Sequence, residues 1–233
     1  MKLNTNSNVY TIVYASVIVI IVAFLLAFVS GALSDRQTEN VRLDKKKQIL
    51  SALNVDLAAC SDPAAKYDEL VKADPIINSE AVVLAENGGF EVDVKAENAK
   101  DSLQDRRLPY SRCEKDGETK YVFPLRGAGL WGPIWGYIAL NDDMSTVYGV
   151  YFSHEGETPG LGAEIATPKF QAQFAGKSIK RDGVLTYISV LKAGQSDENA
   201  DHVDAISGGT MTSRGVEAML RDGISQYEKF LNK

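Results

Sequence analysis

The longest apolar stretch of the sequence lies near its N-terminus. Residues 9–33 form an uncharged run of 25 residues, and about 20 apolar residues are enough for a helix to cross a bilayer. A cleaved signal peptide is the alternative, since residues 30–32 are small and suit a cleavage site. The run is long for a signal peptide, and Lys2 is the only charge before it. We therefore predict an N-terminal tail over residues 1–8 and a retained, single-pass transmembrane helix over residues 9–33.

A charged segment follows the apolar run. Residues 36–57 predict a helix that continues from the span, with apolar positions partly on one side. Asp62 followed by Pro63 is typical of a helix start and predicts a short second helix that ends at about Ala73. We group residues 34–75 as a charged helical connector and residues 76–233 as one folded domain.

The folded domain alternates strand-like and helical patterns. Runs rich in β-branched and aromatic residues predict strands over residues 81–85, 90–94, 120–125, 134–140, 146–152 and 184–191. The pair Asp142-Asp143 predicts a hairpin turn, residues 98–107 an exposed polar excursion, and residues 168–174 a helix. Strands in antiparallel succession, mixed with helices, predict an α+β fold.

The C-terminal pattern is the most regular one. Apolar residues recur at steps of three and four, which predicts an amphipathic helix; they are Val216, Met219, Leu220, Ile224, Tyr227 and Leu231. A polar, glycine-rich turn, residues 204–213, precedes and enters this helix. Because free N–H groups and the helix dipole favour an anion at a helix N-terminus, the turn is a candidate phosphate site. An ordinary loop with hydroxyl caps is the alternative, and Thr212 and Ser213 are the residues expected to cap the helix.

Charge and composition narrow the function classes. Residues 35–233 hold 24 basic and 31 acidic residues, a net charge of −7, which argues against binding nucleic acid or an anionic membrane surface. Cys60 and Cys113 are too few for a metal cluster and could be a disulfide or two thiols. His154 and His202 cannot form a metal site alone. More basic residues follow the span than precede it, and a literal count puts the domain in the cytoplasm. Acidic residues are interspersed with them, and large domains can translocate despite such charges, so charge alone leaves the orientation open.

Two further segments carry candidate chemistry. Residues 129–137 place Trp131 and Trp135 beside glycines, where a planar ring could approach the backbone; each tryptophan could equally pack in the core. Residues 153–162 read Ser-His-Glu-Gly-Glu-Thr-Pro-Gly-Leu-Gly, a loop that offers free backbone N–H groups and hydroxyls. A plain structural turn is the alternative.

The turn before the last helix resembles a known modification motif. Asp204, two residues, then Ser207-Gly208-Gly209-Thr210 is similar to the flavinylation motif, in which a flavin transferase moves FMN from FAD onto the final threonine hydroxyl. The resemblance implies that Thr210 is the acceptor, joined to FMN by a phosphoester. Position 209 is usually alanine in that motif, and glycine is also short enough to admit the cofactor.

The order of the span and the three motifs resembles the C subunits of sodium-translocating NADH:quinone reductases over almost the whole chain. The G subunits of the related Rnf electron-transport complexes share the last two motifs, but the length and the Gly-Leu-Trp-Gly stretch favour the C subunits. The resemblance implies a bacterial inner-membrane protein with a cytoplasmic N-terminus, a periplasmic domain and covalent FMN. It also implies electron relay toward quinone through a flavin in the B subunit, with partners that include membrane lipid and a flavin transferase.

The resemblance also implies which residues approach the flavin. The expected contacts are Glu157, Thr158, Gly160, Leu161, Gly162, Ser207, Gly208, Gly209 and Thr212, with Trp131 as a weaker candidate. Asp204 is expected to serve the attachment reaction or the turn geometry, because a nearby carboxylate disfavours an anionic flavin. The opposing hypothesis is a membrane-anchored binding module without a cofactor, in which the turn is only a helix cap.

Overall fold

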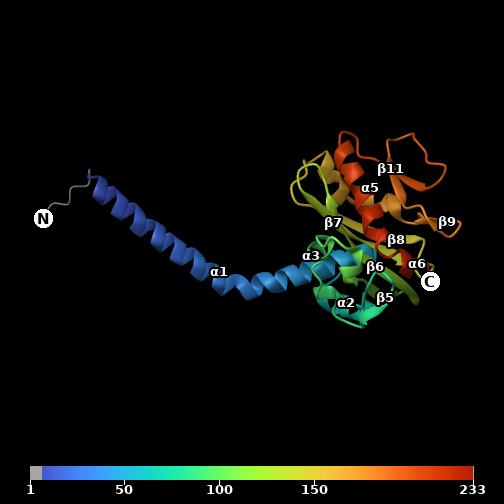
Figure 1. Cartoon of the computed structure of the whole chain (residues 1–233), viewed down its shortest axis with the longest axis horizontal. Helices are drawn as coiled ribbons and strands as arrows, with labels where there is room; N and C mark the ends of the chain where they lie inside the picture. The colour runs from blue at the N-terminus through green and yellow to red at the C-terminus, as the bar shows by residue number, and fades with distance from the viewer. Residues whose placement is uncertain (1–6, 233) are drawn as a thin grey trace. The chain divides into compact units, whose positions relative to one another are not determined.

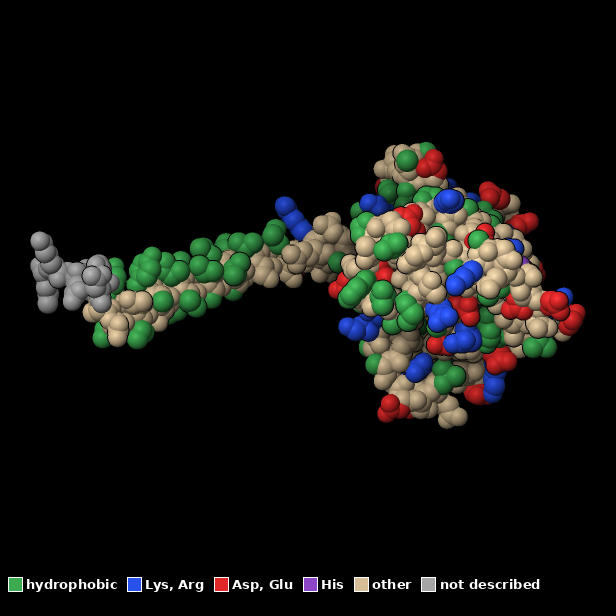
Figure 2. All heavy atoms as spheres, turned by 90° about the horizontal axis from the view of Figure 1, so that it is seen from above, with side chains coloured by type: hydrophobic (Ala, Val, Ile, Leu, Met, Phe, Trp, Pro, Cys, Tyr) green, Lys and Arg blue, Asp and Glu red, His purple; other side chains and the backbone are tan. Residues whose placement is uncertain are grey.

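The computed structural model describes residues 7–232, so residues 1–6 of the predicted N-terminal tail lie outside it. Helix α1 (Asn8–Ala52) contains both the apolar run and its charged continuation. The apolar side chains of its first part are exposed (green in Figure 2). Within residues 7–232, α1 is the one helix long and apolar enough to cross a membrane. The chain divides into two compact units after Lys45.

Helix α1 ends earlier than residue 57, where the sequence had predicted its end. Asn54 adopts a positive φ of 54°, which a right-handed helix cannot contain, and its Nδ2 donates to the carbonyl of Tyr148 at 2.8 Å. The final turn is part of the folded unit. Ile49, Leu50 and Leu53 are buried there in a cluster with Cys113 on the sheet.

A five-stranded antiparallel sheet, in the order β1-β5-β6-β7-β8, is the centre of the domain (Figure 1). Its strands are β1 (Val71–Ala73), β5 (Ser111–Lys115), β6 (Glu118–Ala128), β7 (Pro133–Asn141) and β8 (Val147–His154). The predicted strands at 120–125, 134–140 and 146–152 are therefore confirmed. The predicted hairpin is also present, since the Asp143 carboxylate accepts hydrogen bonds from the backbone of Ser145 and Thr146 at 2.9 and 2.8 Å.

Smaller sheets and helices surround this centre. The small sheets comprise β2 (Ile76–Ile77), β3 (Val83–Ala85) and β4 (Leu108–Pro109); β9 (Lys180–Arg181) and β10 (Val184–Leu185); and β11 (Ile188–Leu191) with β12 (Asp201–Asp204). The short helical elements are α2 (Pro63–Leu70), η1 (Gly89–Glu91), α3 (Val94–Asn98), η2 (Leu103–Asp105), η3 (Gly162–Ala166), α4 (Pro168–Gln171), η4 (Ala172–Phe174) and α6 (Glu228–Leu231). The mixed helical and antiparallel architecture confirms the α+β class.

Several sequence predictions need correction. Residues 90–94 are not a strand: Gly88 has a φ of 103° and starts a 3-10 turn, and Asp93 then caps α3 through Lys95 N and Ala96 N. Helix α2 begins under Asp62 as predicted but ends at Leu70, because the next residues pair with β5. The strand predicted over 184–191 is broken into two at Tyr187, which has a φ of 59°.

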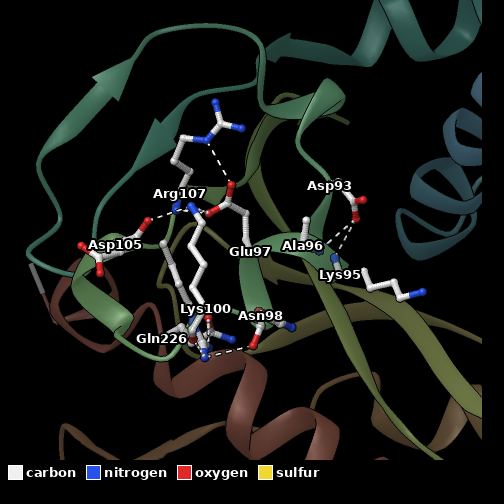
Figure 3. Close-up of polar contacts among 10 residues, drawn as sticks. Asp93, Lys95, Ala96, Glu97, Asn98, Lys100, Asp105, Arg107 and Gln226 are labelled. Atoms are coloured by element: carbon white, nitrogen blue, oxygen red, sulfur yellow. Dashed lines mark hydrogen bonds and ion pairs between the residues drawn. The ribbon is translucent and has the colours of Figure 1, made fainter.

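The polar excursion over residues 98–107 is pinned to the domain rather than loose (Figure 3). The buried Glu97 carboxylate accepts hydrogen bonds from Arg107 N at 2.8 Å, Arg107 Nε at 3.1 Å and Lys100 Nζ at 2.5 Å. Arg106 donates to Gln226 Oε1 at 3.1 Å. The excursion is thereby tied to the C-terminal end of the long helix that follows the glycine-rich turn.

That long helix is α5 (Thr210–Ser225), and it lies against β6. Glycines allow the close approach: a Cβ on Gly127 would lie 2.7 Å from Cβ of Met219, and one on Gly223 would lie 2.6 Å from Cδ2 of Leu125. A Cβ on Gly215 would overlap the carbonyl oxygen of Ala128. The apolar face of α5 is buried in the main core, as its pattern predicted.

Candidate functional site

Glu157 joins the three motifs that the sequence singled out. Its side chain is buried, with 5% of the residue exposed. Its Oε1 accepts from the backbone N–H of Trp131 at 2.8 Å, and its Oε2 accepts from Oγ1 of Thr212 at 2.5 Å. Its own backbone N–H donates to Nδ1 of His154 at 3.2 Å. One carboxylate thus connects the loop after β6, the loop after β8 and the first turn of α5.

Two glycines make room for this carboxylate. A Cβ on Gly129 would overlap Oε1 of Glu157, and a Cβ on Gly162 would overlap both Oε2 of Glu157 and Oγ1 of Thr212. Any other residue at either position would therefore push the loops away from Glu157. The predicted contact residues Glu157, Gly162 and Thr212 do lie together, in the buried contact that joins the loops to α5.

The first turn of α5 differs from the prediction in how it is capped. We expected Thr212 and Ser213 to cap the helix, but the cap position is Gly209, without a side-chain hydrogen bond. Thr212 is buried and donates to Glu157, and the buried Ser213 hydroxyl accepts from the backbone N–H of Ile206 at 3.0 Å. Both hydroxyls face the protein because they lie one turn too far into the helix to cap it.

The hydroxyl of Thr210 has no such partner among residues 7–232. Thr210 is the first helical residue and is exposed. Among the residues that the structure describes, none forms a hydrogen bond with its hydroxyl, nor with the backbone N–H groups of residues 210–212. These groups, together with the positive end of the α5 dipole, can receive a phosphate. Ser207, also exposed, is a second hydroxyl in this segment with no partner among residues 7–232.

The two motif loops touch each other beside a cavity. Leu161, 41% exposed, lies over the turn, since a Cβ on Gly208 would approach its Cδ2 to 2.6 Å. Gly208 has a φ of 77°, which favours glycine. A cavity of about 830 Å³ opens next to this contact. Its lining includes Gly160, Lys169, Phe170 and the segment Asp204–Ser207.

Two other candidate residues, Trp131 and Thr158, expose their side chains. Trp131 is 68% exposed, so it does not pack in the core. The Thr158 side chain is exposed, and its carbonyl accepts from Leu161 N and Ala163 N, both at 3.1 Å. Sequence reasoning did not anticipate Gln173, whose side chain pairs with the backbone of Asp204. No pattern in the sequence connects these two residues, which lie 31 positions apart.

Metal and disulfide chemistry find no support within residues 7–232. No group of three His, Cys, Asp or Glu side chains there could hold a metal ion. Cys60 and Cys113 are free thiols. Burial raises the pKa of the Cys113 thiol to about 12, so this side chain stays protonated and inert. The hydroxyls and amides of the glycine-rich turn carry the candidate chemistry instead.

Comparison with known proteins identifies the class of this domain. Residues 129–225 match the FMN-binding domain family, so the chain is of a flavoprotein class. The C subunit of a Na(+)-translocating NADH-quinone reductase from Pseudomonas aeruginosa is 30% identical over 99% of this chain and 98% of that protein. Its counterpart from Haemophilus ducreyi is 29% identical over 93% of this chain and 89% of that protein. The chain belongs to the family of Na(+)-translocating NADH-quinone reductase C subunits.

Solved structures show the same relationship. The crystal structure of the C subunit from Parabacteroides distasonis aligns with a TM-score of 0.80 and 42% identity, over 86% of this chain and 98% of that one. The structure of Shewanella oneidensis NqrC aligns with a TM-score of 0.69 and 26% identity, over 82% and 96%. The resemblance to the C subunits, which the motif order had suggested, is confirmed.

Proposed function

We propose that this chain carries FMN on Thr210 through a phosphoester and relays electrons within a membrane NADH:quinone reductase. The observation that carries the proposal is the contrast among the hydroxyls of the motif. Thr212 and Ser213 are each 1% exposed and hydrogen-bonded inside the protein, so a bulky donor cannot reach them. Thr210 is exposed, without a partner among residues 7–232, and at the position that the flavinylation motif assigns to the acceptor.

The surroundings of Thr210 suit a phosphate joined to its oxygen. As the first residue of α5, Thr210 places that phosphate beside the free N–H groups of its own turn. Gly208 and Gly209 place no side chain next to Thr210, where a Cβ on Gly208 would meet Cδ2 of Leu161 and one on Gly209 would press on Ile206. When bound, FMN supplies the one-electron redox chemistry. This chain's share would be to hold the group in place, and we propose Ser207, Gly160, Leu161 and Trp131 as the residues that border it.

The relatives support the place of this chain in a larger assembly. They are named as subunits of a Na(+)-translocating NADH-quinone reductase, so we infer that NADH oxidation, quinone reduction and sodium movement belong to the assembled complex. This chain would pass electrons toward another flavin in the B subunit. Helix α1 would anchor it in the bacterial inner membrane, with residues 76–233 in the periplasm and a flavin transferase acting there during maturation.

Intact-mass measurement tests the proposal. The full chain is expressed with and without a flavin transferase, purified in detergent and weighed, and the modified peptide is then sequenced. We expect one FMN-sized increment, present only with the transferase and located on Thr210. A chain that gains no mass although the transferase modifies a known substrate would favour the cofactor-free binding module. An increment on Ser207 or Thr212 would refute the assignment to Thr210.

Protease protection tests the inferred topology. A tag at the C-terminus should be accessible from the periplasmic side, whereas a tag at the N-terminus should be protected there. The reverse pattern would put the domain in the cytoplasm, as a literal count of basic residues suggests, and would exclude modification by an exported transferase.

A further inference from the structure

The backbone of Asp204 is held from outside the motif. Asp204 is the last residue of β12, and β11 pairs with one edge of that strand through Leu191 and Asp204. On the other edge, the side-chain amide of Gln173 accepts from Asp204 N at 2.9 Å and donates to Asp204 O at 3.4 Å. Gln173 comes from the short helix η4. Its amide takes the position that a peptide group of a third strand would occupy.

The two hydrogen bonds from Gln173 engage the backbone of Asp204 and not its carboxylate. Asp204 is exposed, and within residues 7–232 its carboxylate has neither a hydrogen bond nor an ion pair. Asp204 and Gln173 both line the cavity beside the motif. Gln173 therefore fixes where the backbone holds the carboxylate without neutralising it. A backbone fixed on both edges at Asp204 presents that side chain in a narrow range of directions.

We propose that Gln173 is a positioning residue for flavin attachment, because it holds Asp204 in the orientation that the flavin transferase recognises. The inference rests on the proposed function. In the reaction, Oγ1 of Thr210 forms a bond to the FMN phosphorus of FAD, the phosphoanhydride bond breaks, AMP leaves and the hydroxyl proton passes to the transferase. Gln173 acts through Asp204 and touches none of the reacting atoms. The motif that the transferase recognises is thus a folded surface that includes η4.

The chain offers a matched control two residues away. Gln171 is also half-buried, and its amide donates to the carbonyls of Phe152 and Ile165 at 3.0 and 3.1 Å. Its side chain makes two hydrogen bonds like that of Gln173, but within residues 7–232 neither is to the motif. Gln173→Met and Gln171→Met remove the two amides with similar changes of shape, so both should lower the thermal midpoint slightly.

The experiment measures how fast the full chain, purified without flavin, gains mass with FAD and a flavin transferase. We expect Gln173→Met to slow attachment about tenfold, as loss of one or two net hydrogen bonds suggests, and Gln171→Met to leave the rate unchanged. Gln173→Glu keeps the acceptor for Asp204 N–H and should be intermediate. It also serves as the second variant if Gln173→Met does not fold. In an Asp204→Asn background, Gln173→Met should slow attachment no further.

Each outcome separates the inference from the proposed function. An unchanged chain that never gains FMN refutes the proposed function itself. An unchanged chain that gains FMN while Gln173→Met reacts at the same rate refutes only the role of Gln173. Equal slowing by Gln171→Met, or a further tenfold loss in the Asp204→Asn background, would show that the effect does not pass through Asp204 and would also overturn the inference.

Discussion

Two polar segments of the domain, residues 97–107 and residues 204–213, treat their polar groups in opposite ways. In the first, the Glu97 carboxylate accepts from Arg107 and Lys100 (Figure 3). Arg106 donates to Gln226, the residue that follows α5. In the second, the buried hydroxyls are bonded inward, while the Thr210 hydroxyl and the Asp204 carboxylate have no partner among residues 7–232. The first segment uses Glu97, Arg106 and Arg107 for bonds within the fold, whereas the second leaves two polar groups available for a ligand.

The difference teaches where to look for a site in a polar loop. Content of hydroxyls, charges or glycines does not distinguish the two segments, because both are rich in polar residues. The segments differ in which of their hydrogen-bonding groups have no partner within the folded protein. Because buried polar groups are nearly always paired, groups left free on an ordered, well-anchored backbone are available for a partner.

Thr210→Ala should produce the largest effect, complete loss of the FMN increment in intact-mass measurement. The unfolding free energy should change by less than about 0.5 kcal/mol, because the hydroxyl makes no bond to the described protein. In the assembled complex, electron flow to quinone should stop while NADH oxidation by artificial acceptors upstream continues. Thr210→Ser, which keeps a hydroxyl, is the control. Full modification of Thr210→Ala would show that the unpaired Thr210 hydroxyl is not the acceptor, and would contradict the contrast drawn between the two segments.

Glu97→Ala should have the opposite profile, with a loss of stability and no loss of flavin. Removal of the buried carboxylate leaves the Arg107 N–H without its acceptor and should cost about 2 kcal/mol in denaturant unfolding. Asp101→Ala, at an exposed position of the same segment, should be nearly neutral. A marked fall in FMN content for Glu97→Ala would show that the excursion contributes to the site.

Thr212→Ala tests the inward-facing side of the motif. The change leaves Oε2 of Glu157 buried without its donor, so the protein should lose about 1–2 kcal/mol of stability yet still accept FMN on Thr210. Thr212→Ser restores the hydroxyl and should recover most of that loss. Absence of the adduct in a folded Thr212→Ala protein would mean that Thr212 belongs to the reacting part of the motif.

The smallest expected effect is a loss of stability at low pH, because acid should weaken the bonds that Glu97 makes to residues 100 and 107. Burial tends to raise the pKa of Glu97, but hydrogen bonds from Arg107 and Lys100 outweigh it and hold the pKa below its ordinary value of 4.5. The stabilisation is therefore complete above that value and is lost as pH falls through the depressed pKa. Urea unfolding at successively lower pH should show the gap between the unchanged protein and Glu97→Ala closing. A gap independent of pH would contradict the charge assignment.

Much of the fold could be predicted from the sequence. The long strands β6, β7 and β8 are rich in β-branched and aromatic residues, and α5 carries a regular apolar face. The strand predicted over residues 90–94 was wrong. A glycine at positive φ starts a 3-10 turn there and Asp93 then caps a helix, and this local turn chemistry outweighed strand propensity. The Asp93 cap was a readable signal. The short strands β2, β4 and β12 exist only through their pairing partners, which no local pattern reveals.

The candidate site could be predicted in part. Its segments followed from the motifs, but the roles of individual residues depended on contacts between distant positions. Glu157 lies 26 residues from Trp131 and 55 from Thr212, so a sequence cannot show that its carboxylate joins them. The same holds for the inward rotation of Thr212 and Ser213, which depends on α5 starting at Thr210.

The glycine contacts between α5 and β6 have a mechanical consequence. Gly127, Gly215 and Gly223 bring helix and strand close from residue 215 to residue 223 of α5, so little space separates them there. Thr210 is the first residue of that helix. A redox group joined there would be attached to a helix that packs tightly on the sheet, and not to a flexible loop. Because electron transfer weakens steeply with distance, such a mount keeps a constant tunnelling gap to a neighbouring protein once the two are docked.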